Sequence, residues 1–325
     1  MQNFPRPFWK NTNSWNDYFI ELFHFHSQYN PVYKKYLSLI KYAENPAYFT
    51  EIPTLPVTVF KNHPVYITDT PPALYFESSS TTGSIPSKHY IAEPEWYHQS
   101  IISHFRSFFK EEKYTFLCLL PGYLERPNAS LVYMMNYLIQ HFGTENSGFF
   151  ISDFEALKYQ LEKIIQNGEN IFLVGVAFAL LDFAEKYRVS LPQNTIVMET
   201  GGMKGRKKEW IRTELHEYLK RQFGIPKVYS EYGMTELLSQ AYCNDGIRFY
   251  PPQWMRVFTT EINDVFAVND YGVSGILNII DAANLYSCPF IQTQDIGKVY
   301  EDGSFEVLGR LDYSELRGCN LMYTF

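Results

Sequence analysis

The sequence contains few cysteines and no excess of positive charge. Its 325 residues include four cysteines, at positions 118, 243, 288 and 319, and none has CxxC spacing. Isolated cysteines in a chain of this length are typical of a reducing compartment, so we expect free thiols and a cytoplasmic protein. Lysine and arginine total 28 against 35 Asp and Glu, a formal charge of −7 that argues against a nucleic-acid-binding surface.

Long apolar segments, internal repeats and low-complexity tracts are also missing. The longest apolar run, residues 171–181, is too short to span a bilayer and predicts a buried element. The residues after Met1 show no secretory signal pattern. Material for a core is plentiful, because 46% of the residues are hydrophobic and 18% are aromatic. This composition allows one large domain or two smaller ones.

Strand-like and helix-like patterns alternate through the middle of the chain. Strands are expected over residues 114–120, 171–176, 195–198 and 228–229. Helices are expected over residues 130–142, 154–166, 178–187 and 207–223. Such alternation predicts an α/β fold, with layered parallel sheets and flanking helices.

The two ends of the chain have a different character. Residues 15–43 are aromatic and helix-like, and the prolines of residues 46–72 predict an extended connector. Near the C-terminus, short strands are expected over residues 248–250, 255–258, 275–280 and 297–299, separated by Gly, Asn and Asp. They predict a smaller antiparallel or barrel-like portion. We therefore divide the chain into residues 1–240, a helical segment plus α/β core, and a β-rich part, residues 241–325.

A hydroxyl-rich segment follows the apolar residues 73–76. Residues 78–83 read Ser-Ser-Ser-Thr-Thr-Gly and can offer backbone N–H groups and hydroxyls to a phosphate. A solvated Ser/Thr loop is the alternative explanation. Two later segments, residues 229–236 and residues 295–318, are interpreted together with this one.

In this order the three segments resemble the adenylate-forming superfamily of acyl and aryl ligases. Residues 78–83 are similar to its phosphate-binding loop, and residues 232–236, Tyr-Gly-Met-Thr-Glu, to its aromatic-Gly-x-Thr-Glu motif. Asp295 is similar to its ribose-binding aspartate, and residues 309–312, Gly-Arg-Leu-Asp, to its hinge motif.

The closer resemblance is to one branch, the acyl-protein synthetases of the LuxE type. It is carried by residues 52–57 with Phe60 and Lys61, and by residues 119–126, 199–205 and 317–319. The resemblance implies ATP- and Mg²⁺-dependent activation of a fatty or related carboxylic acid to acyl-AMP. It also implies acyl transfer to a cysteine near the C-terminus, for delivery to a partner acyl reductase. The lysine-bearing C-terminal domain of the full-length ligases has no room in this chain.

The resemblance implies a phosphate cradle and nearby positive charge. The cradle candidates are Ser79, Ser80, Thr81, Thr82 and Gly83. Ser80 stands where the superfamily usually has glycine, and Pro86 stands where it has lysine. Lys88 and His89, slightly farther on, are therefore candidates for the positive charge, although Lys88 equally fits a solvated surface lysine.

The second motif supplies candidate residues for binding Mg²⁺ and the adenine base. Glu236 is the expected Mg²⁺-linked carboxylate, because Mg²⁺ takes few carboxylates together with phosphate oxygens, and the Thr235 hydroxyl would meet the α-phosphate. A helix N-cap at Thr235 and Glu236 is the alternative. Tyr232 would stack on adenine and Gly233 would let the base approach the backbone, whereas a core tyrosine is the alternative.

The remaining nucleotide-binding candidates come from two other segments. Asp295 would bind the ribose hydroxyls and Arg310 would reach the ribose or the phosphates. Gln294 replaces the glycine usual before the aspartate, and an ordinary turn residue is the alternative for Asp295. Gly201 and Gly202 follow a predicted parallel strand, at the edge where α/β sheets bind ligands.

Cys319 is the candidate acyl carrier. A thiol near the C-terminus can attack an acyl-adenylate and hold the acyl group as a thioester, and Arg317 would lower its pKa. An incidental buried cysteine is the alternative. Residues 171–181 and the aromatic residues near Tyr123 are candidates for an acyl pocket. Two other functions stay open: an acyl- or aryl-CoA-type ligase delivering to CoA or a carrier protein, and a degenerate nucleotide-binding scaffold subunit.

Overall fold

The computed structural model describes residues 4–79, 85–110, 113–120, 128–151, 153–201 and 210–311. Within these ranges the α-helices are α1 Trp15–Tyr29, α2 Pro31–Leu39, α3 Val59–Asn62, α4 Pro94–Phe109, α5 Ser130–Phe142, α6 Phe154–Gln166, α7 Ala177–Lys186 and α8 Arg212–Phe223. Short 3₁₀ helices occur at η1 Phe8–Lys10, η2 Phe49–Glu51 and η3 Ala282–Asn284.

The strands in the described part of the chain belong to a large sheet and a separate hairpin. They are β1 Leu55–Pro56, β2 Leu74–Glu77, β3 Lys88–Ile91, β4 Thr115–Leu119, β5 Gly148–Phe149, β6 Ile171–Val176, β7 Ile196–Thr200, β8 Tyr229–Tyr232, β9 Ala241–Cys243, β10 Phe249–Tyr250, β11 Met255–Thr260, β12 Ser274–Asp281, β13 Phe290–Val299 and β14 Phe305–Arg310.

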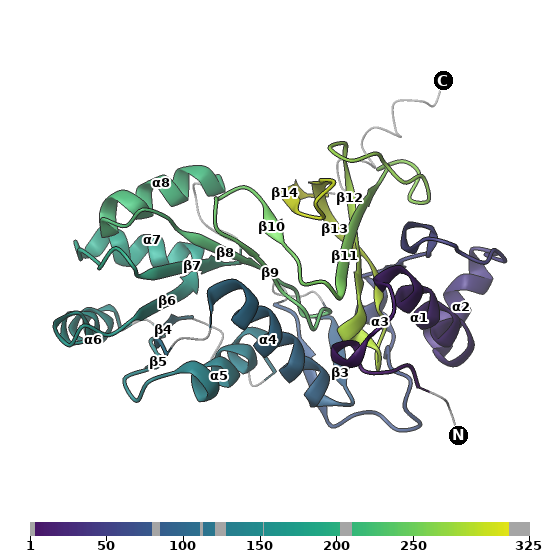
Figure 1. Ribbon diagram of the computed structural model, residues 1–325, viewed down its shortest axis with the longest axis horizontal. Coiled ribbons are helices and arrows are strands. Elements are labelled where there is room, and N and C mark those ends of the chain that lie inside the picture. Colours follow the sequence, from purple (N-terminus) through teal and green to yellow (C-terminus); the bar gives the residue numbers. More distant parts are fainter. Residues whose placement is uncertain are drawn as a thin grey trace.

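One half of the large sheet is parallel and covered by helices on both faces. Strands β5, β4, β6, β7 and β8 run in this order and pair in parallel. Helices α7 and α8 lie on one side of these strands, and α4 and α5 lie on the other (Figure 1). Every residue of β4, β6 and β7 is buried, as expected where both faces of a parallel sheet are covered. The predicted α/β fold is confirmed.

The other half of the sheet is antiparallel. From β8 the path continues through β9, β10, β14, β13 and β12 to β11, with each pair antiparallel, and β1 pairs in parallel with β13. The rings of Phe23 and Tyr33, from α1 and α2, contact Phe290 of β13, so the N-terminal helices cover this end (Figure 1). The expected antiparallel strands are confirmed, and the domain boundary near residue 240 stays a prediction.

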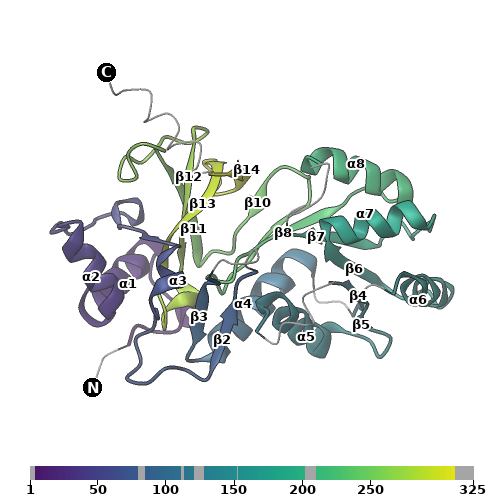
Figure 2. The ribbon, with the colours of Figure 1, turned by 180° about the vertical axis from the view of Figure 1, so that it is seen from behind.

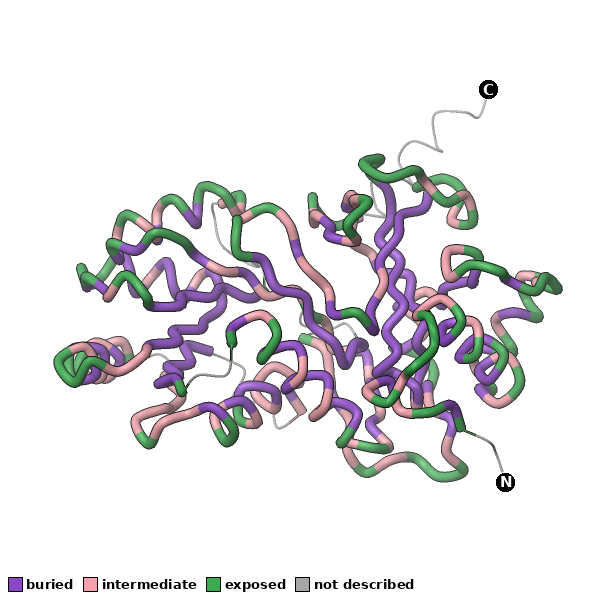
Figure 3. The backbone as a smooth tube through the Cα atoms, in the orientation of Figure 1, coloured by how far each residue is buried: buried purple, intermediate pink, exposed green. Residues whose placement is uncertain are grey.

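The local predictions succeeded where the pattern of apolar residues was regular. Helices α5 and α6 and strand β6 have the expected bounds, and β6, β11 and β12 are buried along most of their length (Figure 3). The helical stretch 15–43 divides in two because the Asn30 side chain caps α2, accepting the N–H groups of Val32 and Tyr33. Helix α4 was not predicted, since the polar residues Ser100 and His104 interrupt its buried face.

Among the described residues, none of the helices has the length and apolar character needed to cross a membrane.

Candidate functional site

The hydroxyl-rich segment joins the two strands of a hairpin. Strands β2 and β3 pair in antiparallel register, and the hairpin lies beside α4 (Figure 2). The stem of the loop is closed by Ser78 N–H donating to the Ser87 carbonyl at 3.1 Å and Ser87 N–H donating to Ser78 Oγ at 2.9 Å. Ser79 is exposed at the rim. The other cradle candidates, Ser80, Thr81, Thr82 and Gly83, lie outside the described residues.

The two basic candidates after the loop are in different environments. The Lys88 ammonium lies 3.4 Å from the Glu77 carboxylate and over the Tyr75 ring, on the surface of the hairpin. His89 is fully buried, and burial lowers its pKa to about 4. The expectation that His89 supplies positive charge is therefore wrong. Its Nδ1 lies 2.8 Å from the Thr235 carbonyl and its Nε2 lies 2.7 Å from Ser287 Oγ.

The candidates for nucleoside binding lie together. Tyr232, the last residue of β8, donates its hydroxyl to Asp295 Oδ2 at 2.8 Å, and its ring packs against Phe249 and Phe305. Asp295 in β13 is the direct cross-strand partner of Arg310 in β14. Pairing of β8 with β7 also brings the end of β7 to this place.

The departure from the superfamily at Gln294 has a structural counterpart. Gln294 Oε1 accepts a hydrogen bond from the Arg310 guanidinium at 3.3 Å, and its carbonyl accepts the Leu311 N–H at 2.7 Å. Arg310 itself is exposed at the end of β14. The longer side chain at position 294 therefore orients the arginine that we expect to reach the nucleotide.

Thr235 and Glu236 lie in a turn between β8 and β9, not at a helix start. The alternative explanation as a helix N-cap is therefore wrong. Glu236 is 5% exposed, and its carboxyl hydrogen-bonds with Ser87 at the stem of the hydroxyl loop. Burial raises the pKa of Glu236, and the positive charges of Arg310 and Lys61 partly offset this effect.

Two buried residues that the sequence did not reveal hold this turn. Asn284 Nδ2 donates to the Glu236 carbonyl at 2.7 Å, and Asn284 Oδ1 accepts the Leu238 N–H at 3.0 Å. Asp281 Oδ2 accepts the N–H groups of Leu238 and Ser239, at 3.0 and 2.8 Å. Burial raises the pKa of Asp281 to about 6, so the carboxylate is ionised at neutral pH. The spacing Asp-Ala-Ala-Asn after a strand is too short a signal to find this pair.

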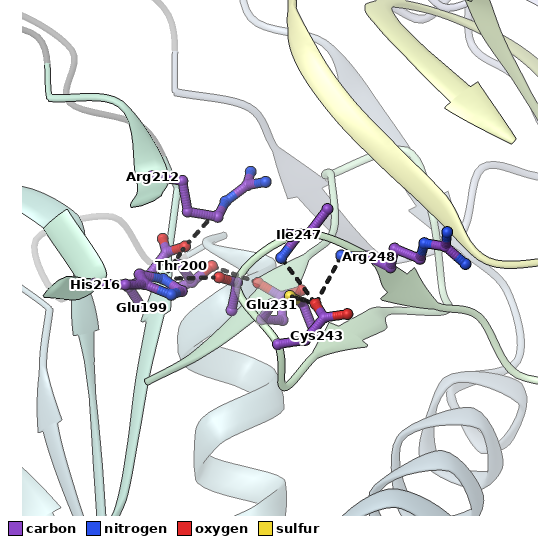
Figure 4. Close-up of polar contacts among 10 residues, drawn as sticks. Glu199, Thr200, Arg212, His216, Glu231, Cys243, Ile247 and Arg248 are labelled. Carbon is purple, nitrogen blue, oxygen red and sulfur yellow. Dashed lines mark hydrogen bonds and ion pairs between the residues drawn. The ribbon is translucent and has the colours of Figure 1, made fainter. Parts of the chain in front are cut away.

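The end of β7 and the middle of β8 form a second buried polar cluster (Figure 4). Glu199 Oε1 lies 3.4 Å from Arg212 Nε and 3.5 Å from His216 Nε2, on α8. Thr200 Oγ1 donates to Glu231 Oε2. The cluster therefore holds two carboxylates on neighbouring strands, and the guanidinium lies beside only one of them.

Two glycines lie next to this cluster, and glycine is favoured at each position for a different reason. Gly201 has a φ of +72°, which favours glycine, and it is exposed at the end of β7. A Cβ on Gly233 would lie 2.3 Å from Glu231 Oε1, so a side chain at this position would displace the Glu231 carboxyl. Close backbone approach is thus available at both glycines, whereas Gly202 lies outside the described residues.

The expected metal chemistry depends on Glu236 alone. Within the described ranges, no three His, Cys, Asp or Glu side chains gather as a protein metal site would require. Mg²⁺ commonly takes one or two carboxylates and completes its shell with phosphate oxygens and water. A single buried carboxylate beside the hydroxyl loop fits such a shared site better than a protein-only one.

The candidates for the acyl pocket and the acyl carrier lie partly in β6 and partly outside the described residues. Residues 171–176 form β6, in which a Cβ added to Gly175 would lie 2.9 Å from Leu180 Cγ and 3.0 Å from the Leu119 carbonyl oxygen. The assignment of residues 171–181 to an acyl pocket stays a prediction. Tyr123 and Cys319 lie outside the described residues.

Comparisons with known proteins agree on one family and one fold. Residues 10–324 match the family model described as acyl-protein synthetase, LuxE. The long-chain-fatty-acid–luciferin-component ligase of Aliivibrio fischeri is 23% identical over 329 residues, which cover 93% of this chain and 85% of the relative.

Solved structures show where the fold recurs. A 2-hydroxyisobutyryl-CoA ligase with 2-HIB-AMP and CoA has a TM-score of 0.70 at 12% identity, covering 91% of this chain and 68% of that one. ATP-bound MatB from Rhodopseudomonas palustris has a TM-score of 0.54 at 17% identity, covering 73% of this chain. The match spans about half of the MatB chain, 47%.

The Glu231 carboxyl, on a partly buried residue, makes stability depend on pH. Burial is the main cause that raises the pKa of Glu231 from 4.5 to about 7. The hydrogen bond with the Thr200 hydroxyl opposes this shift, and the nearby Glu199 charge adds to it. The folded protein then holds a proton that the unfolded chain releases, so the free energy of unfolding falls as pH rises through this window. We expect Glu231→Gln to gain about 2 kcal/mol relative to wild type between pH 5 and pH 8.

Urea unfolding at both pH values measures this difference. Glu145→Gln, at a position away from the cluster, controls for the loss of a surface charge. An unchanged difference between wild type and Glu231→Gln at the two pH values would assign the titration to another group.

Proposed function

Because the chain belongs to the acyl-protein synthetase family of the LuxE type, we propose that it activates a fatty or related carboxylic acid with ATP and transfers the acyl group to Cys319. The observation that supports this most is the position of Glu236. Its carboxyl contacts the stem of the hydroxyl loop, and the charge of Arg310, the cross-strand partner of Asp295, acts on it. Segments far apart in sequence thereby meet at one place.

The proposed reaction has two steps. A carboxylate oxygen of the acid attacks the α-phosphorus of ATP, the bond to pyrophosphate breaks, and acyl-AMP forms. The Cys319 thiolate then attacks the acyl carbonyl carbon, the bond to the AMP oxygen breaks, and a thioester remains on the protein while the proton of the thiol passes to solvent. Delivery of this acyl group to a partner acyl reductase would follow.

Each substrate group has a proposed position. Asp295 would accept the ribose hydroxyls and Tyr232 would lie against the base, while the exposed backbone at Gly201 and Gly233 permits close approach. Glu236 would hold Mg²⁺ together with phosphate oxygens, and the metal would supply charge neutralisation at the phosphates. Arg310 is exposed next to this place and would contribute further positive charge.

The three described cysteines are poor candidates for the acyl carrier. Cys118, Cys243 and Cys288 are fully buried. Burial raises the pKa of Cys243 and Cys288 to about 12 and raises that of Cys118 as well, so few of these thiols are ionised at neutral pH. This inertness supports assigning the carrier role to Cys319.

Removal of the Glu236 charge tests the metal-linked role. We expect Glu236→Gln to lower carboxylate-dependent ATP–pyrophosphate exchange by roughly 100-fold or more, because a lost metal contact costs several kcal/mol in the transition state. Glu169→Gln is the matched control, since Glu169 also accepts hydrogen bonds, from Thr115 and Asn146, at the opposite edge of the sheet. Exchange at the wild-type rate in Glu236→Gln would remove Glu236 from the reaction.

Replacement of the ribose-binding aspartate should affect binding more than chemistry. A contact made equally in the ground and transition states appears in KM, so Asp295→Ala should raise the KM for ATP roughly ten-fold with a smaller change in kcat. Tyr232→Phe, which removes only the hydroxyl donor to Asp295, should give a smaller increase. Exchange kinetics against ATP concentration measure both, and an unchanged KM in Asp295→Ala would place the ribose elsewhere.

Replacement of Cys319 should separate the two steps. Cys319→Ser should keep pyrophosphate exchange but lose the hydroxylamine-sensitive acyl adduct, because a serine hydroxyl is far less ionised than a thiol. Intact-mass analysis after incubation with ATP, Mg²⁺ and a fatty acid measures the adduct, and Cys243→Ala should retain it.

Three outcomes would contradict the carrier assignment or the proposed function. An adduct that persists on Cys319→Ser would assign the acceptor to another group. Exchange without any adduct on the wild-type protein would favour delivery to CoA or a carrier protein, and absence of exchange would favour a scaffold subunit.

A further inference from the structure

The turn that carries Thr235 and Glu236 is held almost entirely by side chains distant in sequence. Its only described backbone hydrogen bond within the turn joins Leu237 N–H to the Met234 carbonyl at 3.1 Å. The remaining partners come from β3, from the last residue of β12 and from η3. We propose that Asn284, Asp281 and His89 are positioning residues for adenylation, which fix this turn so that Glu236 meets Ser87 at the stem of the hydroxyl loop.

Asn284 is the most specific of the three. Its amide spans the turn, with Nδ2 donating to the Glu236 carbonyl at 2.7 Å and Oδ1 accepting the Leu238 N–H at 3.0 Å. A side chain of the same size with a single polar function would satisfy one of these groups and leave the other unpaired. The backbone on both sides of Leu237 is therefore tied to one amide group.

Asp281 fixes the next part of the turn. It accepts the Leu238 and Ser239 N–H groups and the Ser239 hydroxyl, the last at 2.6 Å to Oδ1. Trp254 Nε1 in turn donates to Ser239 Oγ at 2.9 Å. Asp281 and Asn284 are both fully buried, so water does not replace a lost partner.

His89 links the turn to the hydroxyl loop. It lies two residues after Ser87, whose side chain hydrogen-bonds with the Glu236 carboxyl, and its Nδ1 contacts the Thr235 carbonyl at 2.8 Å. Because its pKa is lowered to about 4, the ring is neutral, with Nδ1–H donating to the carbonyl and Nε2 accepting from Ser287 Oγ. Ser87 at the stem of the loop and His89 in β3 therefore contact Glu236 and Thr235, respectively.

Stability and positioning both depend on this network. Removal of one of these side chains leaves a buried backbone group of the turn unpaired, and the complete polar network specifies one conformation. Here that conformation sets the position of the carboxyl proposed to bind Mg²⁺. Displacement of a reacting group by about 1 Å typically costs about 100-fold in rate.

The inference rests on the proposed function, and a matched pair of asparagines tests it. Asn278 is as buried as Asn284 and also makes three side-chain hydrogen bonds, with Thr54, Thr260 and the Ile276 carbonyl. None of its described partners belongs to the turn. Asn284→Ala and Asn278→Ala should therefore lose comparable thermal stability while differing in catalysis.

We expect Asn284→Ala to lower the kcat of ATP–pyrophosphate exchange by about 100-fold with less than about a three-fold change in the KM for ATP. Asn278→Ala should keep kcat within about three-fold of wild type at temperatures where both variants are folded. His89→Phe provides a second variant in case Asn284→Ala fails to fold, because it releases the Thr235 carbonyl from the other side. It should lower kcat in the same way, and His89→Gln, which keeps a donor, should recover part of the rate.

The outcomes separate the inference from the function on which it rests. Wild-type kcat in both Asn284→Ala and His89→Phe, with exchange abolished in Glu236→Gln, would overturn the positioning role alone. Equal loss of kcat in Asn284→Ala and Asn278→Ala would also overturn it, because the effect would then be general destabilisation. Wild-type exchange in Glu236→Gln would overturn the proposed function itself.

Discussion

The reversal of the chain between β8 and β9 is the constraint on which the site depends. Strand β8 pairs in parallel with β7 and antiparallel with β9, so the sheet changes type at this strand. The connecting turn passes through the interior, where backbone N–H and carbonyl groups need partners. Asp281 and Asn284 supply them, and a turn held in this way brings the Glu236 carboxyl to Ser87, at the stem of the hydroxyl loop.

Burial decides the charge state of the site as much as residue type does. His89 and Glu236 were both expected to act through charge, yet burial makes the histidine neutral and raises the pKa of the glutamate. Within the described residues, positive charge acts on Glu236 from Arg310 and Lys61. Under the proposed function, Mg²⁺ and phosphates would meet a carboxyl whose ionised form burial disfavours and these two cations favour.

The fold could be predicted in outline because most of its helices and strands have a recognisable local pattern of apolar residues. The apolar run of β6 and the periodic patterns of α5 and α6 give the expected bounds. Prediction from the local sequence pattern failed where polar residues are buried. Helix α4 buries Ser100 and His104, so its apolar stripe is incomplete, and the run after Glu236 reads as a helix start although tertiary hydrogen bonds hold it as a turn.

The sequence by itself determined the alternation of elements, the order of the three motifs and the family to which they point. Only the tertiary structure brought Tyr232 to Asp295 and Glu236 to Ser87, because contacts between residues so far apart follow from sheet order and not from local pattern. It also decided which polar residues are buried. Asn284 and Asn278 are chemically identical in the sequence, and they differ only in the groups that each one contacts in the folded chain.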